Sequence, residues 1–377
     1  MTNKTNKALI VADLHLSHKH RFPNPQMRLR RDIQAVNNLC REVVRLNCNS
    51  LIIAGDFFDT YNPSIELLNS IIGEMQTLAT DNDVRIYFIR GNGIHEGAKD
   101  RWSNPLLTLA SAIDNALFID CGYHIEPSID DIIMIPHCES SDEFLSNLDS
   151  AIINRNASDK YSNHKDQCYI ICHQWFDTLF RFDSPDTIRC DDILKITNKR
   201  EDVKFRFISG HQHKSVSVYY NDNISIASIG IPIQQNFGDP LDTNAILLES
   251  FTGKLDYHWN KIELSDIKFK KIKASNMEEF ERFTDPDAKK HLYSIDIQCE
   301  EDEKLFKAMS EEGYFIEPNF MKPENVPGKI EREEIKLDSD IESILSETVD
   351  ELSGEPEEVR KEIIAIGMEL TKEPCPF

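Results

Sequence analysis

The sequence lacks any hydrophobic run long enough to cross a membrane. None of its apolar stretches reaches about 18 residues, which is close to the minimum for a spanning helix. The first residues, MTNKTNKALIVADLH, contain neither a long apolar core nor a small-residue cleavage site. We therefore expect no membrane span, no secretory signal and a cytoplasmic location.

Paired cysteine motifs are also missing. The chain has nine cysteines, an odd number, and no C-x-x-C pair occurs among them. This pattern argues against a secreted disulfide framework and against a zinc finger. We interpret the cysteines as reduced thiols, several of them small core residues.

Positive charge is scarce. Lys and Arg number 42 against 65 Asp and Glu, so the formal net charge is −23. Such a balance excludes a protein that binds nucleic acid by bulk charge alone. From Ile330 to Phe377, 15 acidic residues face 5 basic ones, a net −10 within 48 residues.

Apolar residues, in contrast, are sufficient for a sizeable core. They make up 40% of the chain and include 20 Phe and 3 Trp, which excludes a wholly disordered chain. A length of 377 residues corresponds to two or three domains at ~100–200 residues each.

Short apolar runs alternate with amphipathic patterns along the first 260 residues. Apolar strands bounded by helices predict sheets that are buried on both faces, hence an α/β fold. Helices are expected around Leu29–Leu46 and Ser64–Leu78, and a hairpin turn at Asn221–Asn223. The expected strands are Ala8–Ala12, Leu51–Ala54, Val84–Ile89, Ile132–Ile135, Tyr169–Cys172, Phe205–Ile208, Val216–Tyr220 and Ile224–Ile229.

Two smaller parts follow. Residues 265–325 contain a strand (HLYSIDIQ), a helix (EDEKLFKAMSEEG) and a second strand (YFIEPNF), which predicts a small α+β unit. The acidic C-terminal segment shows two short helical patterns, near residues 339–352 and 357–370. They either fold back on this chain or dock on a partner. We expect domains at 1–262, 263–328 and 329–377.

Polar side chains follow five of the expected strands at the point where each strand ends. In an open α/β sheet, ligands bind beyond the carboxyl ends of the strands. A single GD or a single His is usually structural, but five such strand ends in one chain are hard to produce by chance. The residues are Asp13, His15, Asp56, Asn92, His173, His211 and His213.

These side chains are suited to two divalent ions of the Mn, Fe or Zn kind. Two such ions ~3.5–4 Å apart can position a water molecule and clamp a phosphate. The residues therefore predict a two-metal centre for phosphoester chemistry.

The series DLH, GDFFD, GN, H and GHQH resembles the calcineurin-like metallophosphoesterase superfamily over residues 8–240. Within it, the chain is most similar to the nuclease subunit of SbcCD-type DNA repair complexes, as found in T-even-like phages. This narrower resemblance depends on GDFFD before a helix, on the segment IGIPIQQNFGD, on the small cap domain and on the acidic helix-turn-helix. It implies a β-sandwich flanked by helices, followed by an α+β cap and two C-terminal helices.

The resemblance also implies roles for the residues. One ion would be held by Asp13, His15, Asp56 and His213, and the other by Asp56, Asn92, His173 and His211. It implies an Mn²⁺-dependent phosphodiesterase that is a 3′–5′ exonuclease on duplex ends and an endonuclease on single strands. Such a subunit acts in DNA recombination, repair or replication as a homodimer, with an SbcC-like ABC-type ATPase that supplies much of the DNA surface. If phage-encoded, it would work in the bacterial host cytoplasm.

One motif departs from the family pattern, which places a histidine directly after GN. Here Gly93 and Ile94 intervene before His95, the residue that the resemblance makes catalytic. Two extended residues span ~6.6 Å, beyond hydrogen-bond reach. Because glycine has no Cβ, we expect Gly93 to take a positive φ, so that the two residues bulge outward and His95 returns to the site.

Two other functions compete with a nuclease. The first is a protein phosphatase or cyclic-nucleotide phosphodiesterase, although protein phosphatases of this superfamily carry GD-x-x-D-R-G where this chain has GDFFDTY. The second is a weakly active architectural subunit that lost turnover through the altered GN motif.

Several further histidines and arginines are not assigned to the metal centre. We expect His18 and His20 to lie in a solvated loop and His137 to be structural. The cluster Arg28, Arg30 and Arg31 either contacts the DNA backbone or is an ordinary helix surface.

Overall fold

A computed structural model describes residues 6–17, 25–93, 95, 104–126, 132–157, 167–179, 184–198, 203–251, 254–272, 290–297, 300–311 and 313–320. The chain divides into two compact units, Met1–Phe320 and Met321–Phe377. The C-terminal helices predicted near 339–352 and 357–370, and also His18 and His20, lie outside the described residues. The predicted domain boundaries at 262 and 328 stay predictions.

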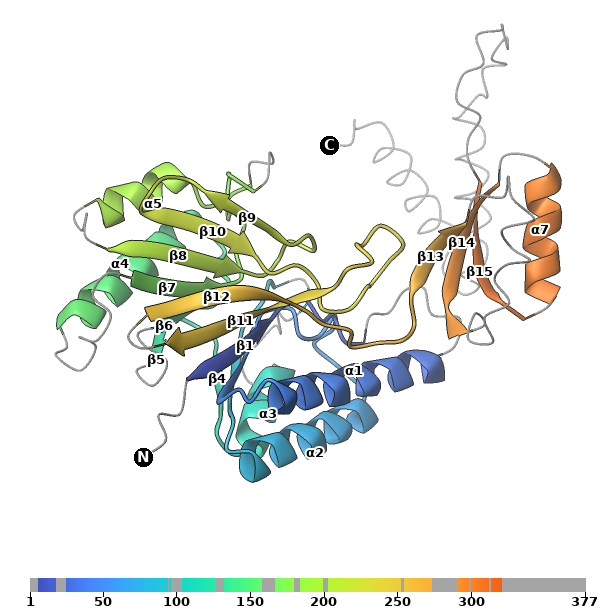
Figure 1. Cartoon of the computed structure of the whole chain (residues 1–377), viewed down its shortest axis with the longest axis horizontal. Helices are drawn as coiled ribbons and strands as arrows, with labels where there is room; N and C mark the ends of the chain where they lie inside the picture. The colour runs from blue at the N-terminus through green and yellow to red at the C-terminus, as the bar shows by residue number, and fades with distance from the viewer. Residues whose placement is uncertain are drawn as a thin grey trace, which may run out of the picture. The chain divides into compact units, whose positions relative to one another are not determined.

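The first of two large sheets contains the N-terminal strand β1 and has the order β12-β11-β1-β2-β3-β4 (Figure 1). The four strands from β1 to β4 are parallel, whereas β11 pairs antiparallel with both β1 and β12. Their bounds are Lys7–Val11 (β1), Ser50–Ala54 (β2), Arg85–Ile89 (β3), Ala116–Ile119 (β4), Asn244–Phe251 (β11) and Lys254–Lys261 (β12).

The second sheet has the order β5-β6-β7-β8-β10-β9. Its bounds are His124–Glu126 (β5), Ile132–Ile135 (β6), Gln167–Cys172 (β7), Lys204–Ser209 (β8), Val216–Tyr219 (β9) and Ile224–Ser228 (β10). The predicted hairpin is confirmed, because β9 and β10 are antiparallel. Its turn is held by the Asn221 side-chain oxygen, which accepts the backbone N–H groups of Asn223 and Ile224.

Helices cover the outer face of each sheet, so the fold is a β-sandwich between helical layers (Figure 1). One layer contains α1 (Pro25–Arg45), α2 (Ile65–Asp81) and α3 (Pro105–Ala112), and the other contains α4 (Ser141–Ala157) and α5 (Cys190–Thr197). This arrangement confirms the expected α/β class and the β-sandwich flanked by helices.

The alternation of side chains along β1 shows how the sequence builds this sandwich. Leu9 and Val11 point into the core beneath the first helical layer. Ala8 and Ile10 belong to the core between the two sheets, together with residues of β7 and β8. Because successive side chains of a strand face opposite sides, a continuous apolar run fills both cores.

A small third sheet follows the sandwich, in the order β13-β14-β15. Its strands Phe269–Ile272 (β13), Leu292–Ile297 (β14) and Phe315–Phe320 (β15) are parallel, and α7 (Glu300–Glu311) connects the last two. Tyr293 and Ile295 of β14 pack against Leu305 and Met309 of α7. The strand–helix–strand pattern expected for the cap is therefore confirmed.

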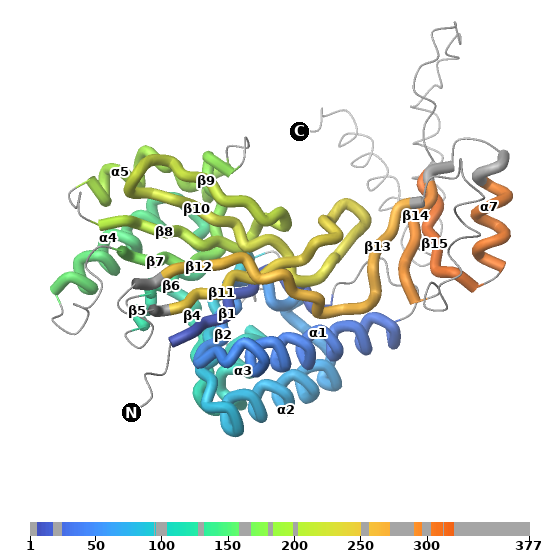
Figure 2. Tube along the Cα trace, in the orientation of Figure 1, coloured from blue at the N-terminus to red at the C-terminus, as the bar shows by residue number. Residues whose placement is uncertain are grey.

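Several elements were not expected from the sequence, namely α3, α4, α5, β4, β5, β11, β12 and β13. Figure 2 shows the chain returning late, as β11 and β12, to lie beside the N-terminal strand β1. Within the part of the chain that the structure describes, no helix combines the length and the apolar character needed to span a bilayer.

Candidate metal centre

Strand ends from both sheets converge on one cluster of carboxylates and imidazoles. Among the residues that the structure describes, three groups of potential ligand atoms each lie within 4.8 Å of one another. Five of their side chains line a cavity of about 540 Å³ together with Trp175 and Lys214, namely His15, Asp56, His95, His211 and His213. The groups are Asp13, His15 and His213; His15, Asp56 and His95; and Asp56, His173 and His211.

Asp56 follows β2 after one glycine and, like His15, belongs to two of these groups. Its Oδ2 atom lies 3.3 Å from His173 Nε2, 3.8 Å from His15 Nε2 and 3.9 Å from His95 Nε2. The side chain is almost completely buried. One carboxylate therefore faces imidazoles from both sides, as a bridging ligand must.

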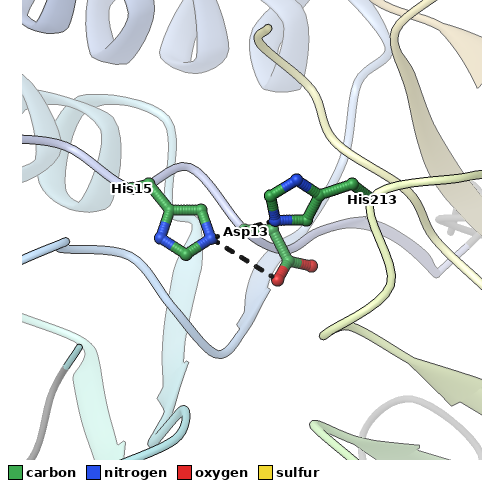
Figure 3. Close-up of side chains that lie close together, drawn as sticks. All are labelled: Asp13, His15 and His213. Carbon is green, nitrogen blue, oxygen red and sulfur yellow. Dashed lines mark hydrogen bonds and ion pairs between the residues drawn. The ribbon is translucent and has the colours of Figure 1, made fainter. Parts of the chain in front are cut away.

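The first group joins residues almost 200 positions apart in the sequence. The rings of His15 and His213 and the carboxylate of Asp13 point toward one another (Figure 3). His15 Nε2 lies 3.2 Å from His213 Nε2 and 3.9 Å from Asp13 Oδ1. Asp13 is also tied to the loop after β8, because its two carboxylate oxygens accept the His211 N–H at 3.1 and 2.9 Å.

Asn92, after β3, lies on the other side of Asp56. Its backbone N–H donates to Asp56 Oδ1 and its side-chain Nδ2 donates to Asp56 Oδ2, both at 3.0 Å. The same Nδ2 is 3.4 Å from His211 Nδ1. All seven predicted ligand residues are thus brought together.

The backbone at this site is strained. The φ angles of Asp13, His15, Asp56 and His211 are 56°, 45°, 48° and 76°, in the left-handed region that costs roughly 1–2 kcal/mol per non-glycine residue. Hydrogen bonds between the first two loops hold this conformation: Asp13 N–H donates to the Gly55 carbonyl and His15 N–H to the Asp56 carbonyl. Strain that is held this way is typical of functional sites.

Two glycines of the motifs are required by close packing. A Cβ on Gly91 would lie 2.1 Å from Asp56 Oδ1, and a Cβ on Gly55 would lie 2.2 Å from His173 Nδ1. Gly55 also has a φ of +88°, which side chains rarely adopt. The glycines of GD and GN therefore let the backbone approach the ligand side chains.

The environment of His173 shows that the centre is built for positive charge. This fully buried ring uses Nδ1 to donate to the Ala54 carbonyl at 2.8 Å. Its Nε2 atom is buried without a hydrogen-bond partner and faces the Asp56 carboxylate. Because a neutral ring of this tautomer presents a lone pair to an anion, a proton or a cation must lie between them.

The pKa values of neighbouring groups agree with this requirement. Burial raises the pKa of Asp13, so that its carboxylate needs a cation nearby to stay ionised. Burial and then the neighbouring His173 lower the pKa of His211 to about 2. His211 is therefore neutral at ordinary pH, which is the form of imidazole that binds metals.

Two further carboxylates orient the histidines. Asp59 Oδ1 lies 2.8 Å from His95 Nδ1. It also lies 3.3 Å from His15 Nδ1, which makes no hydrogen bond with it. Asp239 Oδ1 lies 3.2 Å from His213 Nδ1. When a carboxylate holds Nδ1–H, the Nε2 atom is left to face a ligand. Neither residue was assigned from the sequence, although each stands in a motif, GDFFD and NFGD.

His95 reaches the centre in spite of the insertion before it. Its N–H donates to the Asn92 backbone oxygen at 3.3 Å and to the Asn92 side-chain oxygen at 3.2 Å, which closes a four-residue turn. The positive φ expected at Gly93 is wrong, since Gly93 is not among the described glycines with positive φ. The turn held by Asn92 brings His95 back to the site without a positive φ at Gly93. Ile94, which was expected to bulge outward, lies outside the described residues.

Of the remaining predictions, the one for His137 agrees with the structure and the DNA contact of Arg31 does not. His137 is buried, and its Nδ1 lies 2.9 Å from the His173 carbonyl oxygen, in agreement with a structural role. Arg31 is 1% exposed and donates to the Gln234 carbonyl, so a DNA-backbone contact by Arg31 is wrong. Trp175 and Lys214 line the cavity and were missed, although they closely follow His173 and His213 in sequence.

A family model described as calcineurin-like phosphoesterase matches residues 7–224, more than half of the chain. The chain belongs to the calcineurin-like phosphoesterase family. As a member, it is a metal-dependent phosphoesterase, and the Asp and His groups of this phosphoesterase are suited to a dimetal centre.

Two solved structures are weakly similar to this phosphoesterase. A dimetal phosphatase from Danio rerio has 12% sequence identity and a TM-score of 0.44, covering 69% of this chain and 100% of that one. The purple acid phosphatase PPD1 from yellow lupin (Lupinus luteus) seeds has 11% identity and a TM-score of 0.38, covering 68% and 51%. No curated protein matches the chain in sequence.

Proposed function

We propose that this phosphoesterase is the nuclease subunit of an SbcCD-type complex. It would hydrolyse DNA phosphodiesters with two Mn²⁺ ions, as a 3′–5′ exonuclease on duplex ends and an endonuclease on single strands. An SbcC-like ABC-type ATPase would be its partner in DNA recombination, repair or replication. The observation that carries the catalytic part is the return of His95 to the Asp56 centre, 3.9 Å from Asp56 Oδ2.

The distances around Asp56 support a division of the ligands between two ions. One ion would be held by Asp13, His15, Asp56 and His213, and the other by Asp56, Asn92, His173 and His211. Imidazole, carboxylate and amide ligands without thiolate are suited to Mn²⁺, a hard divalent ion. When bound, the two ions supply the Lewis acidity that phosphodiester hydrolysis requires.

The residues of the chain supply the proton chemistry. Asp59 holds His95 Nδ1 at 2.8 Å, which directs Nε2 toward the cavity. Burial lowers the pKa of His95, but the hydrogen bond to Asp59 and the charge of Asp56 outweigh burial, and the net pKa is raised. The hydrogen bond to Asp59 favours the imidazolium form, and in that form Nε2–H can donate to the leaving oxygen as a general acid. This role for His95 argues for an active enzyme and against a purely architectural subunit.

Three features support DNA over a phosphoprotein as substrate. The second Asp of GDFFDTY is not followed by the Arg-Gly pair of protein phosphatases. A cap sheet follows the sandwich. The cavity is lined by an aromatic ring, Trp175, and an exposed cation, Lys214, the two kinds of group that hold single-stranded nucleic acid.

The acidic character of the chain supports an external DNA-binding partner. At a formal charge of −23, the subunit alone would bind the DNA backbone weakly, even after two divalent ions offset about four charges. We place the partner's docking site in the acidic segment 329–377, and we propose that the subunit self-associates through its early helices.

The test is Mn²⁺-dependent digestion of end-labelled duplex and single-stranded DNA, with and without the cognate ATPase, beside a phosphopeptide and a cyclic nucleotide. The proposal predicts shortening from 3′ ends, faster with the ATPase. If only the phosphopeptide or only the cyclic nucleotide is hydrolysed, that compound and not DNA is the substrate. If the chain binds two ions but hydrolyses none of these substrates, the result would favour the architectural subunit.

A further inference from the structure

Two adjacent charged residues of α1 lie in the protein interior. Arg31 and Asp32 are each 1% exposed. Burial lowers the pKa of Arg31 only to about 10, because the charges of Asp32 and Asp239 oppose the effect, and the guanidinium stays charged at neutral pH. Buried charges are costly unless they are paired and hydrogen-bonded, so their contacts indicate what they do.

Asp32 supports the segment that carries the first two ligands. Its Oδ2 accepts the Ser17 N–H at 2.8 Å, two residues after His15. Asp13, His15 and Ser17 all have positive φ angles, so this segment is strained and needs an anchor outside itself. Asp32 provides one from the helix.

Arg31 supports the segment that orients the third ligand. Its guanidinium donates to the Gln234 carbonyl, at the start of the 234–239 loop. At the end of this loop, Asp239 holds His213 Nδ1, while its Oδ2 accepts the N–H groups of Gln235 and Asn236 at 2.7 and 2.8 Å. Arg31 thus fixes one end of a short loop whose other end sets the ring of His213.

The two supported segments are also joined directly. The Gln235 side-chain amide donates to the Leu14 carbonyl at 2.5 Å, and Leu14 stands between Asp13 and His15. The cap strand β13 closes the network, because the Phe269 N–H donates to Gln234 Oε1 at 3.1 Å. The Arg31 guanidinium lies 5.8 Å from the centroid of the Phe269 ring, within the range of a cation–π contact.

Arg31 and Asp32 support the segments that carry the ligands on one side of the centre. On the other side, His173 is held by the Ala54 carbonyl and Asn92 by the carboxylate of Asp56. A substitution in α1 should therefore displace Asp13, His15 and His213 more than His173 or Asn92.

We propose that Arg31 and Asp32 are positioning residues for one of the two metal ions, the one held by Asp13, His15 and His213. This inference rests on the dimetal function proposed above. The pair aligns two segments, 13–17 and 234–239, which are distant in sequence and must meet for these three side chains to converge.

The test is Mn²⁺ titration by isothermal calorimetry on the full chain, with wild type, Arg31→Met and the matched control Arg30→Met, which alters an exposed arginine of the same helix. We expect two ions in the wild type and in Arg30→Met. In Arg31→Met, one ion should bind with wild-type affinity and the other at least about tenfold more weakly, about 1.4 kcal/mol. Arg31→Lys, which keeps the charge and one donor, should recover part of the loss. Electron paramagnetic resonance provides a second readout, because the coupled Mn–Mn signal of Arg31→Met should need a higher Mn²⁺ concentration to reach its full intensity than that of the wild type.

Equal weakening of both ions in Arg31→Met, or no weakening of either, would overturn the inference. If Arg31→Met does not fold, as judged by circular dichroism, the titration of Asp32→Asn decides by the same two outcomes. A wild-type chain that binds fewer than two ions would instead contradict the proposed dimetal function. The titration thus distinguishes failure of the proposed function from failure of the Arg31 inference.

Discussion

Asp59 Oδ1 lies 2.8 Å from His95 Nδ1 and thereby fixes the ring of a histidine that stands two residues later than the family motif places it. The insertion changes the route of the chain, and the Asn92 turn restores the position of the ring. A carboxylate that holds one ring nitrogen determines what the other nitrogen can do. The general-acid role proposed for His95 depends on this pair.

Removing the His95 ring should lower turnover and leave the metals in place. For His95→Ala we expect a loss of about 10²–10⁴ in kcat for Mn²⁺-dependent DNA cleavage, the usual range for a lost general acid. Asp59→Asn should give part of the same loss. Elemental analysis checks that His95→Ala retains two ions, and wild-type turnover in His95→Ala would contradict the assigned role.

Asp56→Asn should weaken both metal sites together. The substitution keeps the size of the side chain but removes the charge that faces imidazoles from both groups. Elemental analysis after dialysis against Mn²⁺ is expected to show fewer than two ions per chain. Loss of one ion only, with the other at wild-type affinity, would show that Asp56 is not the shared ligand.

Gly91→Ala should disrupt the centre, because its Cβ would meet Asp56 Oδ1 at 2.1 Å. We expect weaker Mn²⁺ binding and a lower Tm. The matched control is Gly73→Ala in α2, where a new Cβ meets nothing within 4 Å and the helix should gain up to about 1 kcal/mol. If both variants bind Mn²⁺ like the wild type, the packing argument for the GN glycine is wrong.

Metal removal should expose a pH dependence of stability that originates at His173. Burial lowers the pKa of this imidazole, but the charge of Asp56 outweighs burial and raises the pKa from 6.5 to about 10. A group whose pKa is raised by folding stabilises the protein below its unfolded pKa, and this contribution is lost as the pH rises through the folded pKa. The Tm of metal-stripped protein should therefore fall between pH 6.5 and about 10.

The control for this prediction is His173→Gln, which cannot titrate in that window. Stripped wild type and stripped His173→Gln are compared by thermal unfolding in chelator across the same pH series. The fall in Tm should be larger in the wild type, and Mn²⁺ should suppress it because a ligating imidazole is neutral. Identical pH profiles of the two stripped proteins would refute the assignment to His173.

Deleting residues 330–377 should separate the subunit from its ATPase. The segment carries a net −10, and such charge steers association with a basic surface. Co-purification of full-length and truncated chains with the cognate ATPase measures the effect, and metal analysis of the truncated chain should still give two ions. A truncated chain that co-purifies as well as the full chain would show that the ATPase docks elsewhere.

The strand-end residues could be predicted from the sequence because the signal is local. Asp13, Asp56 and His173 each follow an apolar run directly or after one glycine, and Asn92 follows one after Arg90 and Gly91. Parallel strands bring their carboxyl ends to one edge. The edge strand β12 (KLDYHWNK) was missed because it is largely polar, and its partner β11 because it pairs with β1 from more than 230 residues away.

The supporting residues could not be predicted because their roles arise from tertiary contacts. Asp59 is one of many acidic residues until His15 and His95 meet it. Arg31 has the sequence context of a surface arginine, yet Gln234 and Phe269 enclose it. At Gly93 the expectation depended on what glycine permits, whereas hydrogen bonds from His95 to Asn92 decided the turn.

The most direct test of the central claim is anomalous diffraction at the manganese edge from crystals grown with Mn²⁺. The account predicts two peaks that share Asp56, one beside Asp13, His15 and His213 and the other beside Asn92, His173 and His211. A single peak, or peaks away from Asp56, would contradict it.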